Sequence, residues 1–92
     1  MTNSNQFLWE DYEFSNFRIS NTNIGNFKLE VCTKNNLFRW SLMVYSNDLN
    51  EIFHLDSGVE PSLKEAKNKV EQIYSKFIFD HLNWFLTNQK TV

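Results

Sequence analysis

Pro61-Ser-Leu-Lys-Glu-Ala-Lys-Asn-Lys-Val-Glu-Gln-Ile-Tyr-Ser-Lys-Phe-Ile-Phe79 is the one long stretch of this 92-residue chain with the pattern of an amphipathic helix. Ser62 is a natural N-cap, and Glu65 three residues later completes a capping box that pairs backbone N–H groups of the first turn. The apolar positions step by three and four residues: Leu63, Ala66, Val70, Ile73 and Phe77. This spacing predicts a helix that starts after Ser62 and buries one face.

The apolar pattern of this helix extends into residues 82–86. An unbroken helix over 62–88 would be about 40 Å long, whereas a compact domain of this size is only about 30 Å across. Two alternatives follow. Either the helix breaks within 80–83, or it extends beyond the domain and offers Trp84 and Phe85 to a partner.

Two alternating stretches ahead of the helix predict an antiparallel hairpin. One stretch covers 27–33 and the other covers 38–45, with turn-forming residues at 34–36 between them. Alternation assigns one face of each strand to the core: Phe27, Leu29 and Val31 in the first, and Phe38, Trp40, Leu42 and Val44 in the second.

Further strands are less clearly marked. A third strand is predicted in 51–56, but its inward face is undefined, because apolar side chains fall on both of its faces. Residues 57–61 are expected to end it. A fourth strand is an open alternative at 17–19, followed by a turn at 21–23. The predicted fold class is α+β: a three- or four-stranded antiparallel sheet with one long amphipathic helix packed on one face.

The composition bounds the class of protein. Nine basic and eleven acidic residues give a net charge of −2, which argues against a surface built entirely for nucleic acid or an anionic membrane. The single cysteine, Cys32, cannot form an internal disulfide and fits a reducing compartment. Residues 1–6 are polar and predict a loose tail rather than a signal peptide. We expect one domain over 1–92, located in the cytoplasm of a host cell.

Candidate catalytic groups are sparse. His54 and Asp56 share a strand face in an alternating strand, but no third residue is spaced to complete a metal site or a triad. Asp80-His81 lies near the helix end, where a histidine suits the helix dipole. Two glycines in the whole chain cannot build a phosphate-binding loop. The sequence therefore predicts a non-enzymatic protein with no cofactor and no metal.

Three lysines, Lys64, Lys67 and Lys69, gather near the start of the helix, where positive charge can hold phosphate. Residues 62–68 resemble the second helix of double-stranded RNA-binding domains, in which a Ser-Lys-Lys-x-Ala-Lys run follows three antiparallel strands. That resemblance implies phosphate contacts by Lys64 and Lys67. The competing interpretation is a solvated helix face stabilised by a Glu65 to Lys69 pair.

Acidic residues form the opposite cluster. Between Arg39 and Lys64 there is no basic residue. The same stretch contains four acidic residues: Asp48, Glu51, Asp56 and Glu60. Together with Glu10, Asp11 and Glu13 they predict an acidic surface for a basic partner, in the extreme a mimic of nucleic-acid phosphate. The alternative is that they only keep loops soluble.

The outward face of the sheet is a further candidate contact surface, with Met43 and Tyr45 among its residues, because methionine and tyrosine are enriched at interfaces. The alternative is that the aromatic segment 7–19 folds over this face. A homodimer formed through Trp84 and Phe85, or through the open face, is also consistent with the aromatic content.

The layout as a whole resembles small orphan proteins of bacteriophages and mobile elements. The shared features are Trp9 and Tyr12 ahead of the sheet, the Phe-x-Leu-x-Val strand at 27–31, the strand centred on Trp40, and the helix start from Gly58. This resemblance implies a stoichiometric inhibitor that binds a host protein, with anti-CRISPR inhibitors and their Cas effector targets as the prominent case. The alternatives are a nucleic-acid-binding module and a self-associating structural protein.

Overall fold

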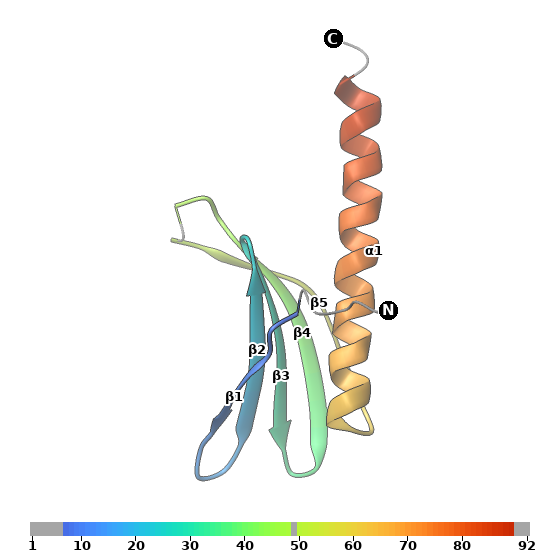
Figure 1. The fold of residues 1–92 in the computed structure, drawn as a ribbon. Helices are drawn as coiled ribbons and strands as arrows, with labels where there is room; N and C mark the ends of the chain where they lie inside the picture. The colour runs from blue at the N-terminus through green and yellow to red at the C-terminus, as the bar shows by residue number, and fades with distance from the viewer. Residues whose placement is uncertain (1–6, 49, 90–92) are drawn as a thin grey trace.

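The computed structural model describes residues 7–48 and 50–89, with side chains as far as His81. Within these residues the elements in chain order are β1 (Glu10–Glu13), β2 (Arg18–Ile24), β3 (Phe27–Lys34), β4 (Leu37–Tyr45), β5 (Ile52–Glu60) and α1 (Leu63–Gln89). The strands form one antiparallel sheet in the order β1-β2-β3-β4-β5, and α1 lies across one face of it (Figure 1). The class is α+β as predicted, but the described sheet has five strands rather than three or four.

The prediction of a turn at 21–23 was wrong, because these residues lie inside β2. The chain reverses instead at Gly25, whose φ of 60° is open to glycine without steric cost, and at the following Asn26. Ser20 and Thr22 occupy the buried positions of β2. Because polar residues fill the core-facing positions, the strand lacks the apolar alternation by which the others are found.

The prediction that 57–61 ends the third strand was also wrong, since β5 continues to Glu60. Gly58 lies inside β5, directly opposite Trp40 of β4. A shift in the β4–β5 register between Leu42 and Met43 leaves Leu55 as an extra residue, which is a β-bulge. Because Gly58 lies within the strand and opposite Trp40, it does not mark a turn, and its lack of a side chain leaves room for the Trp40 ring of the neighbouring strand.

The core lies between α1 and the middle of the sheet. Its buried apolar side chains are Leu29, Val31, Trp40, Leu42, Ala66 and Val70. Leu63, Ile73 and Phe77 pack at its margin, so the inward faces predicted for the two central strands and the helix are confirmed. Tyr74, which was not among the predicted apolar positions, also packs there.

The start of α1 is capped by Ser62. The backbone N–H of Glu65 donates to Ser62 Oγ at 3.1 Å, and the Ser62 hydroxyl donates to the Glu65 carboxylate at 3.2 Å. We expect Ser62→Ala to lower the free energy of unfolding by about 1 kcal/mol in urea denaturation. Ser75→Ala, at an exposed position inside the same helix, is the control and should cause no loss. Equal losses in the two variants would contradict the cap.

The helix is continuous to Gln89, so the alternative of a break within 80–83 is excluded. Its 27 residues make it about 40 Å long, and Figure 1 shows its end standing clear of the sheet. The radius of gyration is 14.9 Å, against about 12 Å expected for a compact domain of this length. The backbone of Trp84 and Phe85 belongs to this projecting part, but their side chains lie outside the described residues.

Candidate interaction surfaces

The segment ahead of β1 is fastened to the helix. Trp9 Nε1 donates to the Glu71 carboxylate at 2.7 Å, and Lys67 Nζ lies 5.2 Å from the centre of the Trp9 ring. The ring of Phe7 meets the ring of Tyr74 edge to face at 5.9 Å between centroids. Phe7 and Trp9 therefore pack on the helix side of the sheet. Tyr12 and Ile19 of the same aromatic segment lie in the sheet itself, so the segment does not fold over the face opposite α1.

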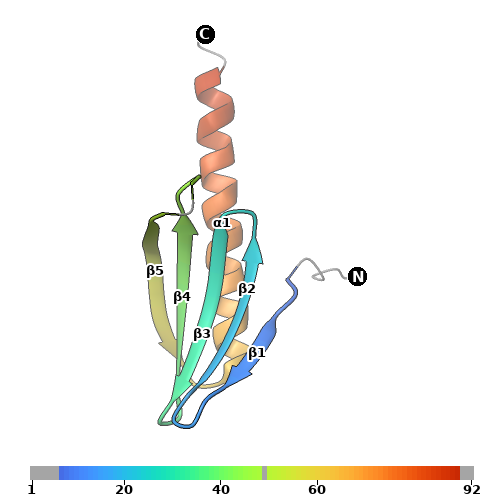
Figure 2. The same ribbon diagram turned by 90° about the vertical axis from the view of Figure 1, so that its left-hand side faces the viewer.

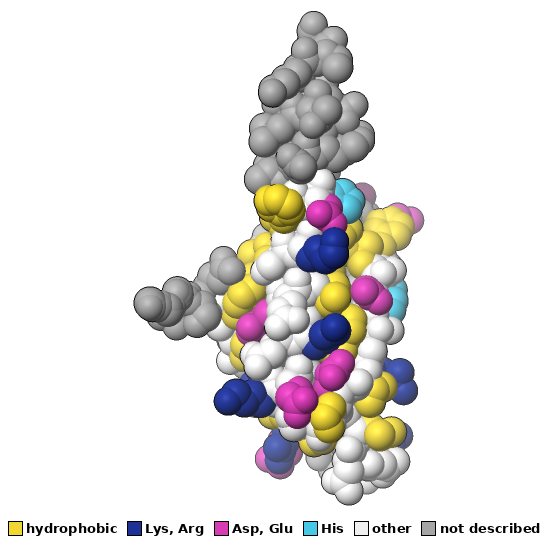
Figure 3. Space-filling model, turned by 90° about the vertical axis from the view of Figure 1, so that its right-hand side faces the viewer, with side chains coloured by type: hydrophobic (Ala, Val, Ile, Leu, Met, Phe, Trp, Pro, Cys, Tyr) yellow, Lys and Arg dark blue, Asp and Glu magenta, His cyan; other side chains and the backbone are white. Residues whose placement is uncertain are grey.

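These contacts divide the lysine cluster. Lys67 is held by the Trp9 ring and by Asp11, whose carboxylate is 3.8 Å from Lys67 Nζ, and its side chain is only 23% exposed. Lys64 and Lys69 are exposed. Figure 3 shows positive and negative side chains interspersed on this side of the molecule, which is not the continuous basic patch that phosphate recognition uses.

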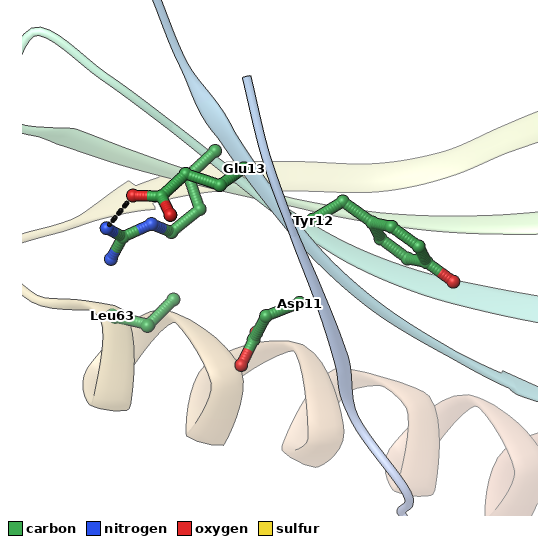
Figure 4. A pocket seen from close by; sticks show the side chains of 5 residues that line it. Asp11, Tyr12, Glu13 and Leu63 are labelled. Atoms are coloured by element: carbon green, nitrogen blue, oxygen red, sulfur yellow. Dashed lines mark hydrogen bonds and ion pairs between the residues drawn. The ribbon is translucent and has the colours of Figure 1, made fainter. Parts of the chain in front are cut away.

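A depression of about 200 Å³ lies where the β1–β2 hairpin approaches the start of α1 (Figure 4). Its lining residues are Asp11, Tyr12, Glu13, Arg18 and Leu63. Arg18 pairs with Glu13 at 2.8 Å, and this hydrogen bond raises the pKa of the Arg18 guanidinium. Asp11 accepts a hydrogen bond from the Ser20 hydroxyl. These charged side chains are therefore already paired within the chain, and the depression has few polar groups left with which to bind a ligand.

The face of the sheet opposite α1 has no element over it in the described part of the chain (Figure 2). One row of cross-strand partners runs over all five strands: Tyr12, Ile19, Cys32, Arg39 and Val59. Met43 and Tyr45, both predicted for an outward surface, lie on this face and are half-buried. The row is mixed in character, with apolar side chains interrupted by a guanidinium.

The outer strand β5 concentrates the exposed apolar surface. Nine large apolar side chains are exposed in the described part of the chain, and four of them belong to β5. These are Ile52, Phe53, Leu55 and Val59, with exposed fractions of 47, 50, 37 and 46%. Single exposed apolar residues are ordinary, but a run of them along one element marks an interaction site.

The four predicted acidic residues lie along the same margin. Asp48 and Glu51 belong to the loop that leads into β5, Asp56 is exposed on the strand, and Glu60 ends it. At about 3.3 Å per residue, β5 alone spans about 30 Å. These acidic residues are therefore spaced along a margin and do not form one compact cluster. Glu10, Asp11 and Glu13 lie on β1 at the opposite edge of the sheet, so their predicted union with these residues in one acidic surface was wrong.

Three of these four carboxylates accept hydrogen bonds within the chain: Asp48, Asp56 and Glu60. Asp48 accepts hydrogen bonds from the Ser46 hydroxyl at 2.7 Å and from the Asn50 backbone N–H at 3.1 Å. The Ser46 bond first, and the Asn50 bond after it, hold the pKa of Asp48 below its ordinary value, so this carboxylate keeps its charge at lower pH. Glu60 accepts a hydrogen bond from Trp40 Nε1 at 3.3 Å.

The bulge separates His54 from Asp56. His54 pairs with Met43 and Asp56 with Leu42, two neighbouring residues of β4 whose side chains point to opposite faces of the sheet. The predicted placement of the imidazole and the carboxylate on one face was therefore wrong. Among the described residues, no group of three histidine, cysteine or acidic side chains could hold a metal ion, and no helix is both long and apolar enough to cross a membrane.

The sequence identified the acidic residues of this margin but not Ile52, Leu55 and Val59 as its apolar part. The available signal was that both faces of 52–55 carry apolar side chains, which is what an outer strand exposed on both sides allows. Comparisons of the chain with protein-family models, curated proteins and solved structures give no match.

Proposed function

We propose that this chain is a non-enzymatic protein-binding domain whose contact surface is the β5 margin, defined as β5 together with Asp48 and Glu51 of the loop before it. The observation that supports the proposal is that exposed apolar and acidic side chains coincide there. Apolar side chains supply area that gains from removal from water, and carboxylates select and steer a basic partner.

A finer proposal follows from the resemblance to phage and mobile-element proteins: the chain acts as an anti-CRISPR-like inhibitor that binds a host Cas effector stoichiometrically in the cytoplasm. Such effectors hold nucleic acid in positively charged channels. An acidic margin about 30 Å long is complementary in charge to a channel of this kind.

The test is affinity capture by the tagged protein from a bacterial lysate containing a CRISPR system, with and without nuclease, read by mass spectrometry. We expect a stoichiometric protein partner that survives nuclease. Charge reversal to lysine at Asp48, Glu51 and Asp56 should abolish its capture. The same reversal at Glu10, Glu13 and Glu30 makes an equal charge change elsewhere on the molecule and should leave capture intact.

Other outcomes overturn the proposal. Material that vanishes on nuclease treatment, and that Lys64→Glu with Lys69→Glu no longer captures, would assign the chain to the nucleic-acid-binding class. Recovery of the bait alone, together with a concentration-dependent mass, would assign it to the self-associating class.

A further inference from the structure

The outer edge of β5 is a strand edge with open backbone groups. β5 is the last strand of the sheet order, and in the described part of the chain no strand lies beyond it (Figure 2). In an antiparallel strand, alternate residues turn their N–H and C=O groups toward opposite neighbours. About half of the residues of β5 therefore direct these groups away from β4.

Natural proteins protect such edges with short strands, lysines, prolines or bulges. The opposite edge, β1, is short and carries three acidic residues in four positions. β5 has nine residues with no lysine, arginine or proline among them. Its bulge at Leu55 divides it, but leaves the five residues from Asp56 to Glu60 in regular register with β4.

From this geometry we infer that the β5 edge accepts an extended segment of a partner protein as a sixth strand. The inferred segment alternates apolar side chains with lysine or arginine. This inference rests on the proposed protein-binding function, and it adds the mode of contact and the chemistry of the partner segment.

The alternation follows from the two faces of β5. Val59 lies on the open face and is 46% exposed, so the side chain of a neighbouring strand next to it on that face meets apolar surface. Asp56 and Glu60 lie on the other face, so a neighbour there meets carboxylates. Opposite charges and apolar pairs stabilise adjacent strands when they lie across from one another. A partner strand that matches both faces is apolar at every second residue and basic between.

The same charges disfavour a second copy of this chain as the occupant. Pairing of β5 with another β5 brings the carboxylates of two copies onto one seam, and like charges on facing strands are destabilising. Asp56 also accepts a hydrogen bond from the Ser57 backbone N–H at 2.8 Å, so this N–H already has a partner within the chain.

The test uses a short fluorescein-labelled peptide of alternating valine and lysine, titrated with the whole protein and followed by fluorescence anisotropy. Two further peptides carry N-methyl groups on alternate backbone nitrogens, one set on odd and one on even residues. A strand that pairs through one edge needs the N–H groups of one set only. We expect one methylated peptide to bind about tenfold more weakly or worse, and the other to bind nearly as the parent does.

Charge variants locate the binding. Glu51→Lys with Asp56→Lys should weaken binding of the parent peptide by about tenfold or more. Glu10→Lys with Glu13→Lys makes the same change in net charge at the opposite edge of the sheet and should alter binding less than about threefold. Circular dichroism checks that both variants are folded.

Equal binding of the two methylated peptides would overturn edge pairing, and equal weakening by the two pairs of charge variants would overturn its placement on β5. If the protein without peptide has twice the monomer mass, and Val59→Lys restores the monomer mass, the β5 edge instead binds a second copy of this chain. If the peptide fails while a nuclease-resistant partner is still captured, the edge inference falls and the protein-binding function stands. If the peptide binds as expected but no partner is captured from lysate, the inhibitor proposal falls instead.

Discussion

Leu29→Ala is expected to lower the free energy of unfolding by about 2–5 kcal/mol, the range for truncating a buried leucine. Leu29 is fully buried. It lies between Thr22 and Leu42 in the sheet, on the face that α1 covers. Since both the strands and the helix surround the site, little of the cavity can close by local movement. Urea denaturation followed by circular dichroism measures the loss, with an unchanged slope as evidence that the unfolded state is the same.

The control for this prediction is Leu37→Ala. Leu37 begins the next strand of the same hairpin but is 53% exposed, so its truncation should cost no more than about 0.5 kcal/mol. A domain of this size has only about 5–15 kcal/mol of stability in total, so the two variants should differ clearly in midpoint. Similar losses at both positions would mean that the core is not centred between α1 and β3.

The central hairpin and the helix were predictable because each of these elements buries one face and exposes the other. Leu29 and Val31 alternate with polar residues, and this period of two survives in the sequence as a strand pattern. The turn between the two strands was predictable from local chemistry. Asn35 and Asn36 have φ values of 55° and 63°, a left-handed geometry that asparagine tolerates better than most residues.

The outer strands were not predictable in the same way. Ser20 is buried, and its hydroxyl donates a hydrogen bond to Asp11 on the neighbouring strand. This pairing cannot be recognised in the sequence before both strands are placed. β5 is exposed on both faces along most of its length, so no alternation marks it. In both β2 and β5, pairing with a distant strand determines the structure, and no local hydrophobic periodicity marks the strand in the sequence.

The candidate interaction surface was also only partly predictable from the sequence. Charge can be counted in a sequence, and the acidic residues do lie along one margin. That the margin is also a strand edge follows only from the strand order. The lysines near the start of the helix show the reverse case. Lys67 is positioned by Trp9 and Asp11, which are remote in sequence, so the spacing of the three lysines did not reveal that one of them has a structural role.

Gly58→Ala is expected to lower the free energy of unfolding by about 1–3 kcal/mol, the usual cost of overpacking. A Cβ added at Gly58 would lie 2.7 Å from Trp40 Cζ2 and 2.8 Å from Trp40 Nε1. The indole is 3% exposed, so it cannot move aside freely, and moving it would also strain its hydrogen bond to Glu60. Chemical denaturation of the variant provides the measurement.

The sign of this effect is what makes the experiment decisive. In an ordinary strand position, replacing glycine by alanine stabilises a protein by about 0.4–1 kcal/mol, because the unfolded chain loses freedom. Trp40→Phe removes the ring atoms that the new Cβ would meet, so Gly58→Ala should cost less in that background than in the native one, with the difference given by a double-mutant cycle. Stabilisation by Gly58→Ala in the native background would show that the indole does not rest on Gly58. If Gly58→Ala instead lowers the free energy of unfolding in the native background and lowers it less in the Trp40→Phe background, residue 58 must be glycine to make room for the Trp40 ring.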